Sequence, residues 1–332
     1  MSNLKAGVKL PVPEFPQRLL LGLQDGFCNL KCPKCWVYGQ SDDKTIDGLR
    51  GRLSLEQSQR ILDEMMGADV LIHPHIWSEP LMTKNLHQHF RAIKDRGLNV
   101  SMNTNALLLT KEISQFLVDI KFDAVLISID AVSPEVLMKT RSTDKLQQIH
   151  DAVFTLLEVR GDKKYPRVGI SFTVEEANLH ERDAFVAFWT QHADVVRVSE
   201  LIDPGGIHKV SPIPSERTPC KSLYQTLTVS HDGTARMCCL DSHGKTNLGN
   251  VLKDGVKNVW HGEAFQKVRH FHETGQYDKV PFCKNCQDWA HYTYHEEIID
   301  GLLIRRSPTT TYYNRINRLE NWNGNLKNSN VN

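Results

Sequence analysis

Eight cysteines are the residues of this 332-residue chain best suited to chemistry. Three of them, Cys28, Cys32 and Cys35, follow a short apolar run in the spacing C-x3-C-x2-C. Three thiolates can bind three irons of a four-iron cluster and leave the fourth iron an open coordination position. Zinc in a structural site normally takes four ligands and has no open position. The spacing therefore favours a ligand-binding iron–sulfur cluster over a zinc site or a chance group of thiols.

The other five cysteines come from separated segments near the carboxyl end: Cys220, Cys238, Cys239, Cys283 and Cys286. The last two form a CxxC pair. Four thiolates from separate segments can close around one cluster, and they can equally hold one structural zinc ion. Three ligands plus four account for seven of the eight cysteines, so either Cys238 or Cys239 is left over.

The composition of the chain excludes several classes of protein. Hydrophobic residues make up 40% of the chain, charged residues 24%, and the net charge is +1, so no polybasic field for nucleic acid is present. No apolar run approaches the roughly 18 residues that a membrane-spanning helix needs, and Met1–Gln17 has no secretion-signal pattern. We expect a cytoplasmic protein without nucleic-acid or membrane partners. A reducing compartment disfavours disulfides and leaves the thiols to metal chemistry.

Six strand-like runs alternate with helix-like runs over residues 18–202. The predicted strands are Arg18–Leu23, Val70–Trp77, Leu98–Asn103, Ala124–Asp130, Val168–Val174 and Val195–Leu201. The predicted helices are Ser54–Met66, which starts with a Ser54/Gln57 capping box, and Lys84–Arg96, Thr110–Lys121, Lys145–Arg160 and Leu179–His192. This alternation predicts an α/β fold, either an open parallel sheet or a partial barrel, with its chemistry at the carboxyl ends of the strands.

The pattern changes after the turn at residues 203–206, where Pro212, Pro214 and Pro219 indicate a linker. Residues 225–230 and 234–239 then predict a β-hairpin, and residues 262–273 predict a helix. We expect an N-terminal extension over residues 1–17, a core over 18–205, a small α+β domain over 206–295 (hairpin plus helix), and a C-terminal segment over 296–332 with a partly disordered tail.

The three-cysteine spacing resembles that of the radical S-adenosylmethionine (SAM) superfamily, and the resemblance extends over about residues 18–202. It implies a partial (βα)6 TIM-like barrel with one 4Fe-4S cluster on Cys28, Cys32 and Cys35. The family's reaction is reductive cleavage of SAM to a 5′-deoxyadenosyl radical, which abstracts a hydrogen atom from the substrate. One departure is Lys34, which occupies a position that is usually aromatic in the family, whereas Trp36 follows the third cysteine.

Polar residues at the predicted strand ends resemble the family's SAM-binding positions. Ser78-Glu79-Pro80 is similar to its Gly-Glu-Pro segment, which binds the methionyl amino group, with serine in place of glycine. A carboxylate suits an ammonium group because charge-assisted hydrogen bonds are strong. The resemblance further implies contacts with SAM by Asn103, Asn105, Ser128, Asp130 and Ser171. Short polar residues are also common in loops, which is the alternative interpretation.

The second cysteine group resembles the auxiliary-cluster domain called SPASM or twitch, and its spacing is similar to that in an aminocyclitol dehydrogenase of the superfamily. A full SPASM motif has further cysteines after the CxxC pair, and none follows Cys286. The resemblance therefore implies one auxiliary 4Fe-4S cluster, with ligands Cys220, Cys238, Cys283 and Cys286. Cys239 is then either a small buried side chain or a hydrogen-atom donor, as in radical SAM epimerases.

Two enzymatic functions follow from the resemblance. The favoured one is a two-electron dehydrogenation of a small polyol, sugar or aminocyclitol, in which the auxiliary cluster takes an electron. The sequence also shows no extension of the kind that many peptide-modifying relatives use to bind a leader peptide. The alternative is epimerisation or crosslinking of a peptide. Both need an external one-electron reductant such as flavodoxin or ferredoxin. A zinc-stabilised binding protein is the non-enzymatic alternative.

Overall fold

A computed structural model describes residues 9–39, 41–201, 216–242 and 244–321. The predicted turn at 203–206, two of the linker prolines and the predicted tail lie outside the described residues. An eleven-stranded sheet organises the chain, in the order β10-β9-β1-β4-β5-β6-β7-β8-β13-β12-β11. Within the described ranges, no helix is both long and apolar enough to cross a membrane.

The middle of the sheet consists of six parallel strands in chain order. They are β1 (Arg18–Leu21), β4 (Leu71–His73), β5 (Asn99–Thr104), β6 (Ala124–Ser128), β7 (Arg167–Val174) and β8 (Val195–Glu200). All six match predicted strands, which confirms the α/β fold class. The strand β4 is shorter than the predicted Val70–Trp77, because Pro74 follows His73 and has no amide hydrogen for the ladder.

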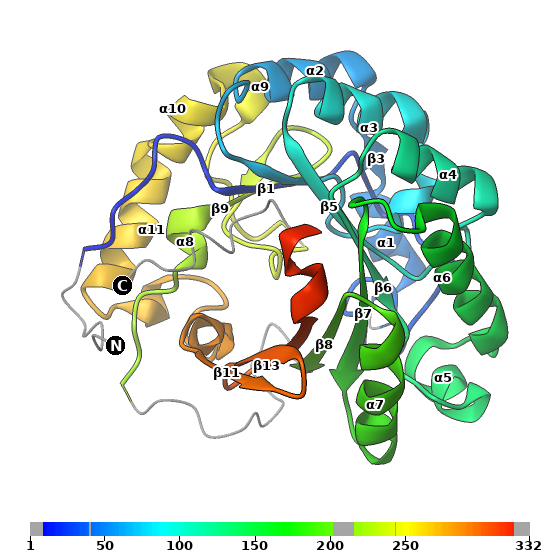
Figure 1. Ribbon diagram of the computed structural model, residues 1–332. Helices are drawn as coiled ribbons and strands as arrows, with labels where there is room; N and C mark the ends of the chain where they lie inside the picture. Colours follow the sequence, from blue (N-terminus) through cyan, green and yellow to red (C-terminus); the bar gives the residue numbers. More distant parts are fainter. Residues whose placement is uncertain (1–8, 40, 202–215, 243, 322–332) are drawn as a thin grey trace.

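Helices cover the outer face of the curved sheet, as Figure 1 shows. The five predicted ones are α2 (Leu55–Asp63), α3 (Leu86–Asp95), α4 (Lys111–Asp119), α6 (Leu146–Arg160) and α7 (Arg182–His192). The capping box at the start of α2 is present: the Gln57 amide donates to Ser54 Oγ, and the Ser54 amide donates to Gln57 Oε1. Two further short helices, α1 (Asp43–Leu49) and α5 (Pro134–Arg141), are capped by Asp42 and Ser133 and were not predicted.

Side-chain alternation gives the sheet an apolar outer face and a mixed inner face. Phe172 of β7 points outward, and its ring centroid lies 4.8 Å from that of Phe185 on α7. On the inner face of β6, β7 and β8, register places one apolar row below one polar row nearer the carboxyl ends: Leu126, Gly169 and Val195, then Ser128, Ser171 and Arg197. Any Cβ at Gly169 would lie 2.5 Å from Leu126 Cδ1, so the apolar row is tightly packed. We call the space enclosed by the inner face the lumen.

The predicted hairpin and helix are present as β9 (Thr226–Val229), β10 (Ala235–Arg236) and α11 (Glu263–Glu273). The hairpin is part of the main sheet, because β9 pairs in parallel with β1 along its whole length. The helix α8 (Ser222–Gln225) precedes β9, and α9 (Val251–Asp254) and α10 (Val256–Trp260) precede α11. Figure 1 shows α9, α10 and α11 continuing the outer ring of helices beyond α2.

The C-terminal segment contains three strands that the sequence did not predict: β11 (His295–Ile299), β12 (Leu302–Arg306) and β13 (Thr310–Arg315). They form an antiparallel meander, and β13 pairs with β8. The short elements are β2 (Gln24–Asp25), β3 (Gly51–Arg52), η1 (Pro80–Met82), η2 (Leu179–Glu181), η3 (Tyr277–Lys279), η4 (Asp288–Tyr292) and η5 (Ile316–Asn321).

The helix η4 links the two sides of the sheet. His291 of η4 contacts the Tyr312 ring of β13, with centroids 6.3 Å apart. The charges of Arg18 on β1 and of Arg197 on β8 both act on the same imidazole. These two strands are the first and last of the parallel core, so the segment that follows the CxxC pair lies between them.

Candidate active site

The first three cysteines lie in a loop that is folded by its own backbone. The Cys35 amide donates to the Cys32 carbonyl at 2.9 Å, and the Gly39 amide donates to the Cys35 carbonyl at 2.7 Å. A Cβ at Gly39 would lie 2.1 Å from the Cys32 carbonyl oxygen, so only glycine fits there. The Tyr38 amide donates to Cys35 Sγ at 3.4 Å. Short-range hydrogen bonds therefore fold the part of the loop that carries Cys32 and Cys35.

The environment of these thiols fits a metal cluster. Burial raises the pKa of Cys28 to about 12, and the charges of Glu79 and of the other two thiols add to the effect. Burial also raises the pKa of Cys32, opposed by Arg141 and Lys34. Three mutually repelling thiolates at such a site need a cationic partner, and a four-iron cluster supplies one. Among the described residues, no three His, Cys, Asp or Glu side chains converge tightly enough to hold a single metal ion.

Glu79 is a buried carboxylate beside the Cys28 thiol, and it is 4% exposed. Its Oε1 accepts from Thr104 Oγ1 at 2.5 Å and from the Leu81 amide at 3.1 Å, and its Oε2 accepts from the Asn105 amide at 2.9 Å. Burial raises the pKa of Glu79 against these three hydrogen bonds. The carboxylate is thus held rigidly at the carboxyl ends of β4 and β5.

Two other predicted SAM contacts lie close to Glu79. The Asn105 side-chain amide donates to Asn29 Oδ1 of the cysteine loop at 2.7 Å. Ser78 Oγ donates to the Gln24 carbonyl at 2.8 Å, which ties the segment before Glu79 to β2. The structure therefore brings Ser78, Glu79 and Asn105 together next to Cys28. Asn103 lies on β5, where its backbone amide donates to His75 Nε2 at 2.9 Å.

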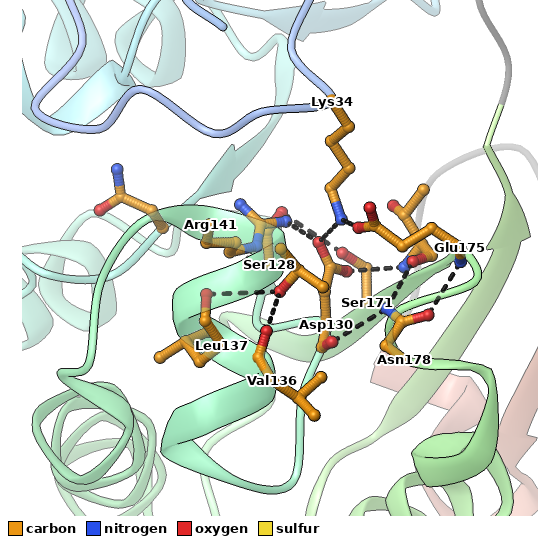
Figure 2. A network of polar contacts seen from close by, with 12 residues as sticks. Lys34, Ser128, Asp130, Val136, Leu137, Arg141, Ser171, Glu175 and Asn178 are labelled. Carbon is orange, nitrogen blue, oxygen red and sulfur yellow. Dashed lines mark hydrogen bonds and ion pairs between the residues drawn. The ribbon is translucent and has the colours of Figure 1, made fainter.

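Asp130 is the centre of a buried ionic network, shown in Figure 2. Its Oδ2 lies 2.6 Å from both Lys34 Nζ and Arg141 Nη2, and Lys34 also pairs with Glu175 Oε1 at 2.7 Å. Its Oδ1 accepts from the Thr173 amide at 2.6 Å. The side chain is fully buried, which opposes ionisation, but Arg141 and Lys34 outweigh burial and hold the pKa of Asp130 below its usual value.

The same network includes the polar row of the lumen. Ser171 Oγ, in the middle of β7, donates to Ser128 Oγ at the carboxyl end of β6, at 3.3 Å. Asn178 donates to the Asp130 carbonyl at 3.0 Å and to the Thr173 carbonyl at 2.9 Å, and it accepts from the Glu175 amide. The predicted Ser128, Asp130 and Ser171 therefore lie together, and Lys34 connects them to the cysteine loop.

Sequence reasoning noted Lys34 as a departure from the family and gave it no role. The structure places its ammonium group between two carboxylates, one of them buried. A usable signal was present in the sequence, because an unexpected lysine implies an acidic partner and Asp130 was already a candidate at a strand end. Thr104, Glu175 and Asn178 gave no comparable signal, since their roles depend on how three strands align.

The second cysteine group gathers at the β9–β10 side of the lumen. Burial raises the pKa of Cys238 well above its usual value, and the charges of Cys283 and Cys220 add to this. Cys220 likewise interacts with Cys286 and Cys283. Cys220 and Cys238 therefore both lie near Cys283, and Cys220 also lies near Cys286. Cys239 is solvent-exposed, so its interpretation as a small buried side chain is wrong. Partial desolvation of its thiol raises its pKa to about 12, and the charges of Asp288 and Cys286 add to this.

His272 of α11 joins two of these cysteines and is fully buried. The Cys220 amide donates to its Nδ1 at 3.3 Å, and its Nε2 lies 3.3 Å from Cys283 Sγ. Because Nδ1 accepts a hydrogen bond, the ring hydrogen must be on Nε2, which therefore donates to the sulfur. Sequence reasoning missed this residue, because a histidine in a helical His270-Phe271-His272 run gives no sign of a sulfur partner.

Trp77 links the two thiol groups through hydrogen bonds. Its indole Nε1 donates to the Cys239 carbonyl at 2.8 Å, and its own carbonyl accepts from the Tyr38 hydroxyl at 2.7 Å. The Tyr38 amide in turn donates to Cys35 Sγ. Both groups of cysteines are therefore anchored to the same residue beside the lumen.

Two family models match this chain. One is the radical SAM superfamily, over residues 26–188, and the other is the SPASM iron–sulfur cluster-binding domain, over residues 220–287. The protein belongs to the radical SAM superfamily. The matches confirm the predicted cofactors, SAM and 4Fe-4S clusters, and this radical SAM enzyme carries both the SAM-binding cluster and an auxiliary-cluster domain.

Its curated relatives perform varied reactions. The chain is 25% identical over 160 residues to Fe-coproporphyrin III synthase of Methanosarcina barkeri, covering 46% of this chain and 36% of the relative. It is 24% identical over 206 residues to a probable GTP 3',8-cyclase of Methanococcus maripaludis, covering 60% and 65%. The matched part therefore spans about a third of the length of the synthase and just under two thirds of the length of the cyclase. A match of 28% over 116 residues is to the SAM-dependent 2-deoxy-scyllo-inosamine dehydrogenase of Niallia circulans, covering 35% and 44%.

Solved structures confirm the fold. BtrN in complex with AdoMet and 2-DOIA is 18% identical, with a TM-score of 0.56 over 82% of this chain and 94% of that chain. SuiB of Streptococcus suis bound to the precursor peptide SuiA is 14% identical, with a TM-score of 0.65 over 83% and 72%. These likenesses support the partial barrel with its C-terminal domain.

Proposed function

We propose that this radical SAM enzyme dehydrogenates a hydroxyl-bearing carbon of a small polyol, sugar or aminocyclitol. When bound, SAM and the first cluster supply a 5′-deoxyadenosyl radical that takes one hydrogen atom, and the auxiliary cluster supplies an acceptor for one electron. The loss of one proton completes a two-electron oxidation to a carbonyl. The observation that carries the proposal is that both thiol groups border the same lumen through Trp77.

The chain's own residues prepare the SAM side of the lumen. Glu79 is held by three hydrogen bonds next to Cys28, so its carboxylate is placed to bind the methionyl ammonium group of SAM. Asn103, Asn105, Ser128 and Ser171 offer neutral polar groups along the same rim for the ribose. These assignments extend the family resemblance to individual residues.

Asp130 has a different role in this proposal from the direct SAM contact suggested by the resemblance. Its side chain is fully buried, and both oxygens already interact with Lys34, Arg141 and Thr173. We infer that it acts on SAM through Arg141, which it holds beside Cys32 and Cys28. The Arg141 guanidinium is then the group that can face the SAM carboxylate.

Cys220, Cys238, Cys283 and Cys286 are the proposed ligands of the auxiliary cluster, which leaves Cys239 free. All eight cysteines are free thiols in the structure, and a reducing, cytoplasmic compartment keeps them so. An external one-electron donor such as flavodoxin or ferredoxin completes the proposal, because SAM cleavage consumes an electron.

The proposal is tested by incubating the anaerobically purified enzyme with SAM, a chemical reductant and candidate alcohols deuterated at the hydroxyl-bearing carbon. We expect deuterium in the released 5′-deoxyadenosine and one carbonyl product for each SAM consumed. Deuterium that enters the product from heavy water, without oxidation, would instead support the peptide-epimerase alternative, in which Cys239 donates a hydrogen atom. Failure to cleave SAM under strong reductant would contradict both functions.

A further inference from the structure

Two histidines at the end of β4 have no part in the function proposed above. His73 is the last residue of that strand, and its side chain alternates with that of Ile72, which is fully buried in the main hydrophobic core. His73 therefore faces the lumen. The ring of His75 contacts it edge to face, with the two centroids 6.3 Å apart. The two imidazoles thus form one patch on the wall of the lumen.

The neighbouring strand β5 holds both rings. Ser101 Oγ lies 3.0 Å from His73 Nε2, and Ser101 is itself 6% exposed. The Asn103 amide donates to His75 Nε2 at 2.9 Å. That amide lies beyond the last residues that pair between β4 and β5, so the imidazole takes the place of a strand residue as its partner. Each ring is therefore fixed by a hydrogen bond to β5.

The bond from Asn103 also fixes the position of the hydrogen on the His75 ring. Because Nε2 accepts, the hydrogen of the neutral ring must be on Nδ1. Burial lowers the pKa of His75 to about 4, so the ring is neutral near pH 7. Within the described residues, this ring has no hydrogen bond other than the one to Asn103. Its Nδ1 is therefore a donor that still lacks an acceptor.

This donor lies close to the SAM side of the lumen. Asn103 is followed along β5 by Thr104 and Asn105, which donate to the two oxygens of the Glu79 carboxylate. Both histidines are only half-buried, yet burial is the main cause of the lowered pKa of each ring. The surface that they retain therefore faces the enclosed lumen and not bulk water.

A buried donor without an acceptor is costly unless a ligand supplies one. A neutral N–H suits an uncharged oxygen, and it serves a hydroxyl and a carbonyl equally well because both accept hydrogen bonds. We propose that His75 Nδ1 donates to the oxygen on the substrate carbon that is oxidised, and that His73 with Ser101 binds the oxygen on the adjacent carbon. The inference rests on the proposed function and narrows its substrate to a 1,2-diol, because two rings in contact reach two neighbouring oxygens.

The test measures binding directly and does not depend on catalysis. The anaerobic holoenzyme, with SAM present, is dialysed to equilibrium against tritium-labelled myo-inositol, in which every carbon bears a hydroxyl group. Dialysis avoids the general stabilisation that polyols give proteins at high concentration. The competitor is cis-1,3,5-cyclohexanetriol, whose hydroxyl groups are on alternate carbons. We expect saturable binding of inositol, and competition by the triol that is about tenfold weaker because one hydrogen bond is lost.

Variants locate the binding site. His75→Phe should weaken inositol binding about tenfold with the iron content unchanged, and His75→Gln, which keeps an acceptor for the Asn103 amide and an N–H donor, should recover part of the loss. The matched control is His89→Phe on the outer helix α3, where His89 Nδ1 lies 3.0 Å from Ser58 Oγ of α2, and inositol binding should be unchanged.

Absence of saturable inositol binding, equal competition by the triol, or equal affinity in His75→Phe and the unmodified enzyme would overturn the inference. SAM cleavage in the same samples is a separate measure. An enzyme that binds inositol through His75 but never cleaves SAM would contradict the proposed function and leave the binding site in place.

Discussion

The two thiol groups are built in opposite ways. The first spans eight residues, Cys28 to Cys35, and short-range backbone hydrogen bonds fold it. The second extends from Cys220 to Cys286, and its ligands come from three segments, two of which are joined by His272 of α11 through the Cys220 amide and Cys283 Sγ. The first group therefore has a locally folded loop, to which contacts such as that of Lys34 with Asp130 are added, while the second is assembled by the tertiary fold alone. Damage to the fold should affect the auxiliary site before the SAM-binding one.

The charges around the two groups also differ. Two cations, Lys34 and Arg141, lie near the first group and oppose the rise in the pKa of Cys32 that burial causes. Near the second group, Asp288 raises the pKa of Cys220, Cys239 and Cys286 further. The second group therefore holds its protons more strongly before a cluster forms, and we infer that its assembly depends more on the charge of the incoming iron.

The largest expected effect comes from Gly39→Ala, a substitution that disturbs the first cysteine group and leaves the second unchanged. The new methyl group would overlap the Cys32 carbonyl oxygen at 2.1 Å and force the cysteine loop open. We expect SAM cleavage to fall at least about a hundredfold, because misplacing a reacting group by about 1 Å can cost that much. Iron should fall from about eight to about four per chain.

The matched control for that prediction is Gly48→Ala. A Cβ at Gly48 in α1 meets no atom within 4 Å, so cluster content and SAM cleavage should be unchanged. Equal losses in both variants, or full activity in Gly39→Ala, would contradict the view that the first group is locally determined.

The second prediction tests which of the adjacent residues Cys238 and Cys239 is a ligand of the auxiliary cluster. Cys238→Ala should lose the auxiliary cluster, so that about four irons remain, while SAM cleavage continues without oxidised product. Cys239→Ala should keep both clusters, because Cys238 is the proposed ligand and the charges of Cys283 and Cys220 act on its thiol. Iron counts and electron paramagnetic resonance check both variants, and loss of the cluster in Cys239→Ala alone would reverse the ligand assignment. Undiminished product in Cys239→Ala would also exclude it as an obligatory hydrogen-atom donor.

A third prediction concerns the network around Asp130. Lys34→Met removes one of two cations from a fully buried carboxylate, and breaking a buried pair in this way costs about 3 kcal/mol of unfolding free energy. Because the folded pKa of Asp130 is lowered, its contribution to stability is present above the usual carboxyl pKa and is lost as pH falls through the folded value. In Lys34→Met that loss should begin at a higher pH.

Urea unfolding of the anaerobic holoenzyme at several pH values measures this effect. The control is Lys31→Met, in an exposed pair with Asp43 at 2.9 Å, where the change should stay within about 1 kcal/mol. Equal destabilisation in the two variants would show that the buried network adds nothing beyond a surface pair.

The smallest expected effect is a shift in the reduction potential of the auxiliary cluster. His272→Phe keeps a ring in the buried site but removes the Nε2 donor to Cys283 Sγ and the acceptor for the Cys220 amide. Hydrogen bonds to cluster sulfurs raise the potential, so the variant should have a lower one, with the first cluster unchanged. A redox titration followed by electron paramagnetic resonance tests this, with the exposed His270→Phe as control. An unchanged potential would restrict His272 to a packing role.

The comparison also shows what could be predicted from sequence. The six core strands were predictable because short apolar runs alternate with helix-like runs over residues 18–202, and the first cluster was predictable because its ligands are neighbours along the chain. The meander β11–β13 was not, since its residues are mostly half-exposed and polar, and its strands are stabilised by pairing with β8. His272 and Glu175 were not predictable either, because each contacts residues that are far away in the sequence.

The pairing of β9 with β1 and of β13 with β8 bears on how this chain can be divided. A fragment that ends near residue 200 would have the whole radical SAM match but would leave unpaired backbone groups along both outer strands of its sheet. Exposed strand edges of this kind invite self-association. Recombining auxiliary domains between relatives would therefore require matched edges on β1 and β8, as well as matched cysteines.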